Sequence, residues 1–290
     1  MNRQRGFTLV EMIMVIVITG IIAGMVAVFI ATPVKGYVDS VRRAGLTDVA
    51  DLALKRMALE IRTAVPNSVR LSSGSATTLC TANTTTNCYL EFIPSRTGGR
   101  YCTDSDICPS GTGGALSYTA AADYFDVLGP THSVIQSDFL VVYNTGQVDA
   151  TDPTRSLSAY TAGNIRTQGS APSATGLTIS GNPFPFASPS NRFQAVPSSG
   201  PVSFACRDVG GSTNGTGELR RHSSYATSIP FGNTPTPTTG GALLADNISA
   251  CQFTYDTVSA TNGLVSLSLT LTREGESVTL LHQIHVDNMP

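Results

Sequence analysis

The first 31 residues constrain the fold of this chain more than any other part of its sequence. A leader containing Arg3 and Arg5 precedes an apolar run, residues 12–31, in which Thr19 is the only polar side chain. An α-helix needs about 20 such residues to cross the hydrocarbon core of a bilayer. The sequence therefore predicts a membrane-spanning helix at residues 12–31.

A cleaved secretory signal is the simpler alternative for such a segment. The apolar region of a signal is only about 7 to 15 residues long and leads to a small-residue A-x-A cleavage site. The residues after Ala31 read Thr-Pro-Val-Lys, which is a poor match. Length and cleavage pattern both favour a helix that stays in the protein.

One carboxylate, Glu11, lies at the edge of the predicted helix. An ionised carboxylate within a membrane segment costs up to about 3 kcal/mol, less near the interface, and commonly marks a functional pairing. No Lys or Arg occurs between Arg5 and Lys35, so after removal of the leader the nearest cation would be a free α-amine on Phe7. Two interpretations remain open: pairing with such an amine, or a side chain that reaches the lipid head groups.

The leader and the start of the helix resemble the cleavage and methylation motif of the type IV prepilin family. The resemblance rests on the basic Arg3 and Arg5, Gly6 before the cut, Phe7 after it, and Glu11 at the fifth mature position. It implies cleavage between Gly6 and Phe7 by a membrane prepilin peptidase, N-methylation of Phe7, and packing of the helix into the core of a filament. In that family the Glu pairs with the N-terminal amine of a neighbouring subunit during assembly.

Charge predicts the orientation of the chain. By the positive-inside bias, the leader, residues 1–6, stays cytoplasmic and the C-terminal region is exported. The resemblance implies that the membrane is a Gram-negative inner membrane, with the C-terminal region in the periplasm, or outside the cell when in a pilus. Without Arg3 and Arg5, the 18 basic residues become 16 against 20 acidic, a net charge of −4. This balance argues against nucleic-acid binding by bulk charge.

The cysteines agree with export, because all of them follow the predicted membrane helix. They are even in number, which in an oxidising periplasm favours disulfides: Cys80, Cys88, Cys102, Cys108, Cys206 and Cys251. Six cysteines allow 15 pairings. We favour Cys80 with Cys88, Cys102 with Cys108, and Cys206 with Cys251, because the first two pairs bracket short loops and the third joins two strand-like segments. Zinc is disfavoured, since no C-x-x-C occurs and no His is close to a Cys.

The helix is predicted to continue to about Arg62, so that residues 7–62 form one element with a kink or brief break at Pro33. The predicted apolar stripe of its exported half is Val34, Val38, Val41, Gly45, Val49, Leu52 and Leu59. The predicted polar face is Asp39, Arg42, Arg43, Asp48, Asp51, Lys55, Arg56 and Glu60. This pattern predicts that one side of the helix covers a β-domain and the other meets solvent or neighbouring subunits.

Residues 63–290 are predicted to form one exported β-rich domain stapled by disulfides. Strand signals occur at residues 89–93, 138–143, 202–206 and 251–255. A final hairpin is predicted from alternating Val265 to Leu271 and Val278 to Val286 around a turn at residues 273–276. Residues 144–200 indicate long loops with occasional strands rather than a separate domain. The fold class is thus α+β: a long helix on an antiparallel sheet with long loops.

The sequence offers no active site, so no enzyme, cofactor or metal centre is predicted. Residues 210–217 are rich in Gly but lack the Lys of a phosphate loop. His282 and His285 fall on opposite faces of a strand, which disfavours a shared metal. Two carboxylate pairs lack the pattern of a calcium loop and are interpreted as solvated loop residues: Asp104 with Asp106, and Asp149 with Asp152.

Four further segments resemble a minor pilin of the mannose-sensitive haemagglutinin (MSHA) pilus system. They are residues 56–71, 184–196, 201–206 and the final hairpin ending V-D-N-M-P. The resemblance implies a structural subunit that helps to initiate or cap a pilus, with other minor pilins, the major pilin and an inner-membrane assembly platform as partners. The alternatives are a related J-type minor pseudopilin of type II secretion, and a tip adhesin whose loops form a binding surface.

Overall fold

The computed structural model describes most of the 290-residue chain. The described ranges are 6–72, 79–84, 86–104, 106–111, 113–119, 123–130, 132–149, 151–152, 155–232, 240–257 and 261–290. One long helix, α1 (Leu9–Ile61), leads into a β-rich region. Asp104, Asp106, Asp149 and Asp152 lie inside the described ranges, whereas Ser105 between the first two lies outside them.

The helix, Leu9–Ile61, lies within the predicted range of residues 7–62. The Thr8 hydroxyl accepts a hydrogen bond from the Glu11 N–H at 3.3 Å, which caps the N-terminus. Arg62 is the C-terminal cap. The expected break at Pro33 is absent, because the helix continues through this residue. Neighbouring turns therefore hold the helix despite the missing N–H, and a kink of the axis remains a prediction.

The strands of the β-region fall into two groups. Those of the larger sheet are β1 (Arg70–Ser72), β2 (Leu79–Ala82), β3 (Cys88–Phe92), β10 (Val202–Arg207), β11 (Gly217–His222), β12 (Ala242–Thr257), β13 (Asn262–Arg273) and β14 (Glu276–Asp287). Those of a small closed barrel are β4 (Thr97–Tyr101), β5 (Tyr124–Leu128), β6 (Phe139–Val142), β7 (Ile165–Gln168), β8 (Gly176–Ser180) and β9 (Arg192–Val196). The predicted strands and hairpin are all present within these elements.

The larger sheet is antiparallel, in the order β1-β3-β10-β11-β12-β13-β14, with β2 paired to β12 off this path. The first half of β12 pairs with β11 and the second half with β13, and the register shifts near Asn247, where φ is 55°. The β13–β14 hairpin is unbroken from its ends to Arg273 opposite Glu276. Its two turn residues, Glu274 and Gly275, both have positive φ, which suits a type I′ turn.

The side of α1 that meets the sheet is not the predicted one. The buried helix residues are Leu46, Ala50, Ala53, Leu54, Met57, Ala58 and Ile61. The predicted stripe is largely solvent-exposed: Val41 is 54% exposed, Leu52 72% and Leu59 66%. At about 100° per residue, the predicted stripe and the buried stripe are centred about 150° apart around the helix. The C-terminal half of α1 therefore carries two apolar stripes on nearly opposite sides, one against the sheet and one exposed in the described part of the chain.

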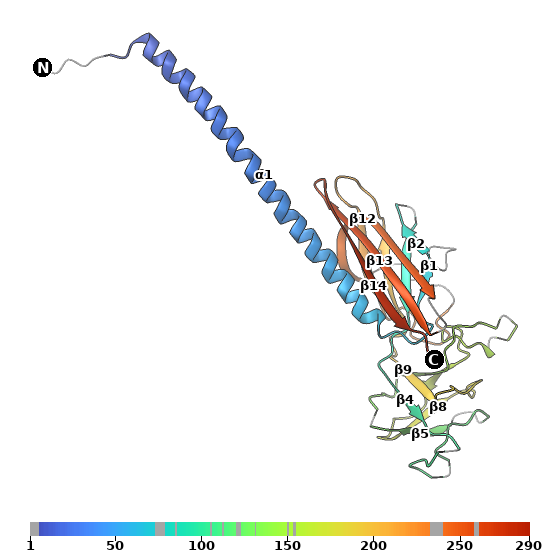
Figure 1. Cartoon of the computed structure of the whole chain (residues 1–290). Coiled ribbons are helices and arrows are strands. Elements are labelled where there is room, and N and C mark those ends of the chain that lie inside the picture. Colours follow the sequence, from blue (N-terminus) through green and yellow to red (C-terminus); the bar gives the residue numbers. More distant parts are fainter. Residues whose placement is uncertain are drawn as a thin grey trace.

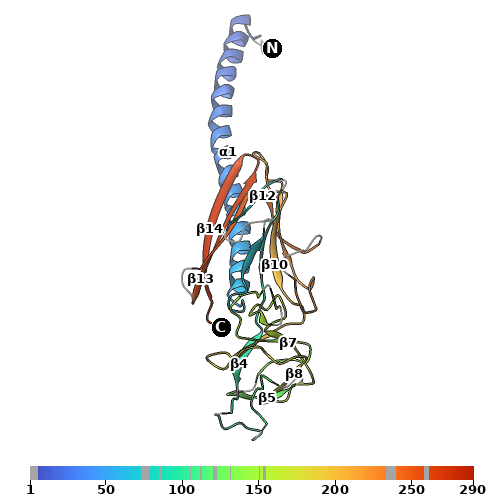
Figure 2. The same ribbon diagram turned by 90° about the vertical axis from the view of Figure 1, so that its right-hand side faces the viewer.

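The barrel was not predicted. Three of its strands, β7, β8 and β9, come from residues 144–200, which the sequence indicated as mainly loops, and they close a cylinder with β4, β5 and β6. The barrel has its own aromatic core that includes Tyr101, Phe125 and Phe193. Figures 1 and 2 place it at the end of the β-region far from the N-terminus of α1.

The six cysteines form three disulfides in the pairing that the sequence favoured. Cys80 is bonded to Cys88, Cys102 to Cys108, and Cys206 to Cys251, with Cα separations of 5.6, 5.8 and 6.5 Å. The first and third lie in the core of the larger sheet. The second closes a loop that follows β4 of the barrel.

Candidate assembly site on the N-terminal helix

The predicted processing residues lie at the free end of α1. Phe7 is 74% exposed, and Glu11 faces solvent in the first turn of the helix. A Cβ atom added to Gly6 would meet nothing within 4 Å. Packing within the chain therefore places no demand on Gly6, and any need for a small residue there must come from another molecule.

The first half of α1 is exposed along its length in the part of the chain that the structure describes. Its most apolar 18-residue window has a mean hydropathy of 2.9, and none of that window is buried. The side chains from Leu9 to Ile30 are exposed, although nearly all are large and apolar. Thr19 donates its hydroxyl hydrogen to the Val15 carbonyl within the helix, so this polar group needs no external partner. Length and composition make this half fit to cross a membrane.

Glu11 is the polar exception. Among the described residues it makes no ion pair, and the next basic residue along the helix is Lys35, 24 positions away. At about 1.5 Å per residue that separation is about 36 Å. Its side chain thus has no cation within reach in its own helix, which is compatible with pairing to a neighbour.

A set of ion pairs joins the C-terminal half of α1 to the β13–β14 turn. Arg43 contacts Glu276 at 2.5 Å, and Arg42 contacts both Glu274 and Asp39. Exposed pairs each contribute little, about 0 to 1 kcal/mol. These pairs fix the position of the β13–β14 turn against the helix, close to the first half of α1.

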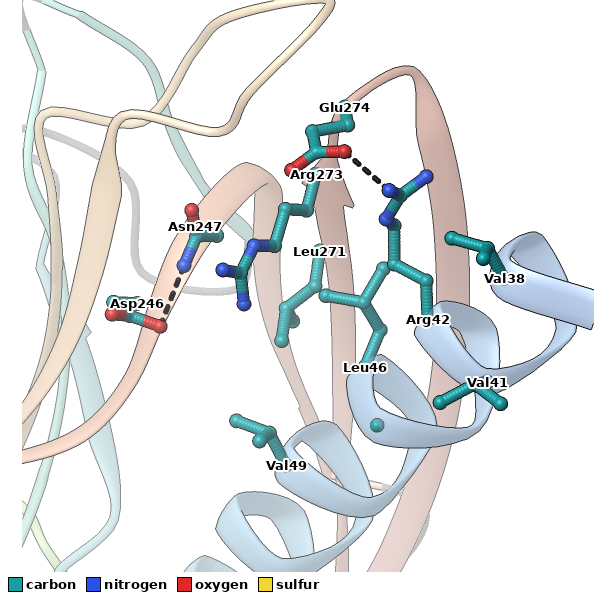
Figure 3. Close-up of a pocket in the computed structure, with 11 residues that line it drawn as sticks. Val38, Val41, Arg42, Leu46, Val49, Asp246, Asn247, Leu271, Arg273 and Glu274 are labelled. Atoms are coloured by element: carbon teal, nitrogen blue, oxygen red, sulfur yellow. Dashed lines mark hydrogen bonds and ion pairs between the residues drawn. The ribbon is translucent and has the colours of Figure 1, made fainter. Parts of the chain in front are cut away.

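Beside these pairs a cleft of about 510 Å³ lies between the helix and the sheet (Figure 3). Its apolar lining includes Leu46, Val49 and Leu271, and Arg42 and Glu274 meet at its rim. Sequence analysis missed this arrangement because its partners are more than 230 residues apart. The charges of residues 42–43 and 274–276 were visible in the sequence, but nothing in their spacing linked them.

A second charged cluster joins the larger sheet to the barrel region. Glu91 on β3 is 1% exposed and accepts hydrogen bonds from Arg70 at 2.8 Å and from the Tyr225 hydroxyl at 2.7 Å. The Arg70 guanidinium lies 3.5 Å from the ring centre of Tyr160. Burial raises the pKa of Glu91, and the positive charge of Arg70 partly offsets this rise.

The other predicted candidates have structural roles. Asp106 accepts hydrogen bonds from Thr103 and forms an ion pair with Arg100, and these contacts lower the pKa of Asp106. The Asp149 carboxylate accepts hydrogen bonds from the backbone N–H groups of Thr151 and Asp152. Among the described residues no group of three or more His, Cys, Asp and Glu side chains could hold a metal. His285 is exposed and His282 is half-buried, as alternation along β14 requires.

Comparison with known proteins gives one match. A family model described as the prokaryotic N-terminal methylation motif matches residues 1–27. No curated protein and no solved structure matches the chain. The matched motif implies processing by a prepilin peptidase and assembly with other pilins, and it supports a pilin or pseudopilin role. The motif and the apolar helix fit a membrane-anchored protein with a C-terminal domain, and together they support a type IV prepilin-like protein.

Proposed function

We propose that this protein is a minor pilin that takes part in initiating or capping assembly of a type IV, MSHA-like pilus. The observation that carries the proposal is the continuous apolar surface of α1. Exposed side chains cover the membrane half, and the stripe that includes Val38, Val41 and Leu52 extends the surface beyond the bilayer. A surface of this length has to be covered, by lipid before assembly and by other subunits afterwards.

One observation favours a low-copy subunit over a shaft subunit. The barrel adds residues 97–196 to the helix and sheet, at the end far from the membrane helix. A bulky addition of this kind suits a terminal position, where no further subunit has to stack on it. The MSHA assignment rests on the resemblance of residues 56–71, 184–196, 201–206 and the final hairpin ending V-D-N-M-P. In this account Gly6 and Phe7 are the processing site, and the partners are other minor pilins, the major pilin, the prepilin peptidase and the assembly platform.

Glu11→Val tests the assembly role. The change removes a charge from the membrane segment, so insertion should be at least as efficient as in the wild type. Loss of a salt bridge with a neighbour's amine should lower filament number about tenfold or more, since about 1.4 kcal/mol of docking free energy is a factor of ten. Filaments are counted by electron microscopy, and membrane levels by immunoblotting.

Thr19→Val is the matched control, because it also removes a polar group from the membrane half but one satisfied within the helix. It should leave filament number unchanged. Normal piliation with Glu11→Val, at normal membrane levels, would reject the pairing role. Deletion of the whole gene distinguishes a type IV pilus from a type II secretion pseudopilus. Loss of pili with normal protein secretion supports a role in the pilus. Loss of protein secretion with normal pili supports a role in a type II pseudopilus.

A further inference from the structure

A second cleft, of about 340 Å³, lies on the barrel side of the molecule. Its lining residues come from the turn before β7, from β7, from the end of β8 and from the connection between β11 and β12. They include Ile165, Arg166, Ser180, Asn182 and Ile229. The volume is at the lower end of small-molecule pockets, which span about 300 to 1,000 Å³. The cleft can therefore hold a ligand the size of a single sugar.

Arg166 is the unusual residue of this cleft, because it is a buried cation. Arg166 is only 7% exposed. Its guanidinium donates hydrogen bonds to backbone carbonyls of two segments, residues 162–165 and residues 182–183. The acceptors are the carbonyl oxygens of Ala162, Gly163, Ile165, Asn182 and Pro183. Within the described part of the chain, no carboxylate pairs with it. Carbonyl dipoles satisfy its hydrogen bonds but bring no formal negative charge, and Arg stays protonated in proteins.

Three residues that line the cleft have donor groups to spare. The Nε hydrogen and both Nη1 hydrogens of Arg166 are engaged, whereas Nη2 donates one of its two hydrogens, to the Pro183 carbonyl at 2.6 Å. The side chains of Ser180 and Asn182 line the same cleft and make no hydrogen bond to another described residue. One guanidinium N–H, one hydroxyl and one amide are thus available to a ligand.

We propose that this cleft binds the carboxylate of an acidic sugar. A carboxylate would supply the counter-charge that the buried guanidinium lacks, and charge-assisted hydrogen bonds to Arg are among the strongest in proteins. Ser180 and Asn182 would bind the remaining oxygens of the sugar. Ile165 and Ile229 form an apolar wall for the ring. This inference is independent of pilus assembly, because no residue of α1 lines the cleft.

The test uses the full-length protein in detergent micelles, titrated by calorimetry with galacturonate, its methyl ester and galactose. We expect galacturonate to bind with a Kd of about 1 mM. The ester and galactose have the same ring without the charge, and should bind about tenfold more weakly or not at all. Equal affinity for the three sugars, or no saturable binding of galacturonate, would overturn the proposal.

Variants at the rim of the cleft test its location without disturbing the fold, since Ser180 and Asn182 are exposed. The double change Ser180→Ala with Asn182→Ala should weaken galacturonate binding about tenfold. Ser190→Ala, an exposed serine in the β8–β9 connection outside the cleft, is the control and should bind as the wild type does. Unchanged affinity in the double variant would show that the sugar binds elsewhere. Glu11→Val should retain full binding, so that failure of the assembly role and failure of this site give different results.

Discussion

The core of the larger sheet and the core of the barrel differ in whether α1 takes part. Seven residues between Leu46 and Ile61 of the helix lie in the sheet core, and no described residue of α1 lies in the barrel core. The strands differ as well: β12, β13 and β14 have 12 to 16 residues, whereas the barrel strands have four or five. The sheet core is therefore shared with α1, whereas the barrel core is not, although a third core that includes Val65, Ile93 and Val141 joins the two regions. We expect changes in the barrel core to affect assembly less than changes in the sheet core.

A matched pair of buried phenylalanines tests this separation most strongly. Phe253 on β12 is 1% exposed in the sheet core, and Phe125 on β5 is fully buried in the barrel core. Replacing either by Ala should cost about 3 to 5 kcal/mol of local stability. We expect Phe253→Ala to reduce filament number and Phe125→Ala to leave it near normal, as counted by microscopy. Equal loss of filaments in both variants would show that the two units are not separable.

Two disulfides within the larger sheet, Cys206–Cys251 and Cys80–Cys88, should differ in how much they stabilise the fold. Cys206 and Cys251 are 45 residues apart, and Cys80 and Cys88 are 8 apart. In the chain-entropy account the longer loop contributes about 4 kcal/mol and the shorter about 2.5 kcal/mol. Replacing the first pair by Ala should thus lower the denaturation midpoint of the full-length protein more than replacing the second.

Non-reducing peptide mapping checks the pairing that underlies this ranking. A peptide that joins Cys206 to any cysteine other than Cys251 would contradict it. So would equal midpoints for the two double variants, since both bonds lie in one core and differ mainly in loop length.

The junction between sheet and barrel should show a pH dependence carried by Glu91. A carboxyl whose pKa is raised on folding stabilises the folded state at low pH, and this contribution is lost as pH rises from the ordinary value of 4.5 through the folded-state pKa. Glu91→Gln should remove this contribution, so that the free energy of unfolding falls less steeply as the pH rises. Burial also raises the pKa of Asp138, but the variant leaves that group in place.

The measurement is the unfolding free energy of wild type and Glu91→Gln from pH 4.5 to 7.5. The difference in unfolding free energy between wild type and Glu91→Gln should change in that pH range and become constant above the folded-state pKa of Glu91. Carboxyls with lowered pKa values, such as Asp106 and Asp149, act below their ordinary value of 3.8 and outside this window. Parallel curves for the two proteins would contradict the role given to Glu91.

Long, regular patterns made the helix and the last hairpin predictable from the sequence. The 20-residue apolar run and the alternation from Val265 to Leu271 each correspond to one element with one environment. The helix face was misassigned because this half of the helix is apolar on two sides: Leu54, Met57 and Ile61 face the sheet, while Val41, Leu52 and Leu59 are exposed. Helical spacing alone does not tell which of two apolar stripes the sheet covers.

The barrel and both charged clusters could not be predicted for different reasons. Barrel strands such as β7, Ile165–Gln168, have only four or five residues and are mostly buried, so they show no alternation to distinguish them from loops. The Glu91 cluster and the Arg166 cleft draw on segments far apart in the chain, such as β3 with Tyr225, and only the tertiary fold brings them together. The N-terminal motif was visible because its residues are consecutive.

The central claim is that this chain is processed as a prepilin before assembly. Intact-mass analysis of the protein purified from membranes tests it directly, with Gly6→Val as the comparison. Since no neighbour packs against Gly6, this variant should fold normally yet keep its leader. We predict a wild-type mass that begins at methylated Phe7 and a variant mass that begins before residue 6. A wild-type protein that keeps its leader, or a variant cut and methylated at Phe7, would contradict the account.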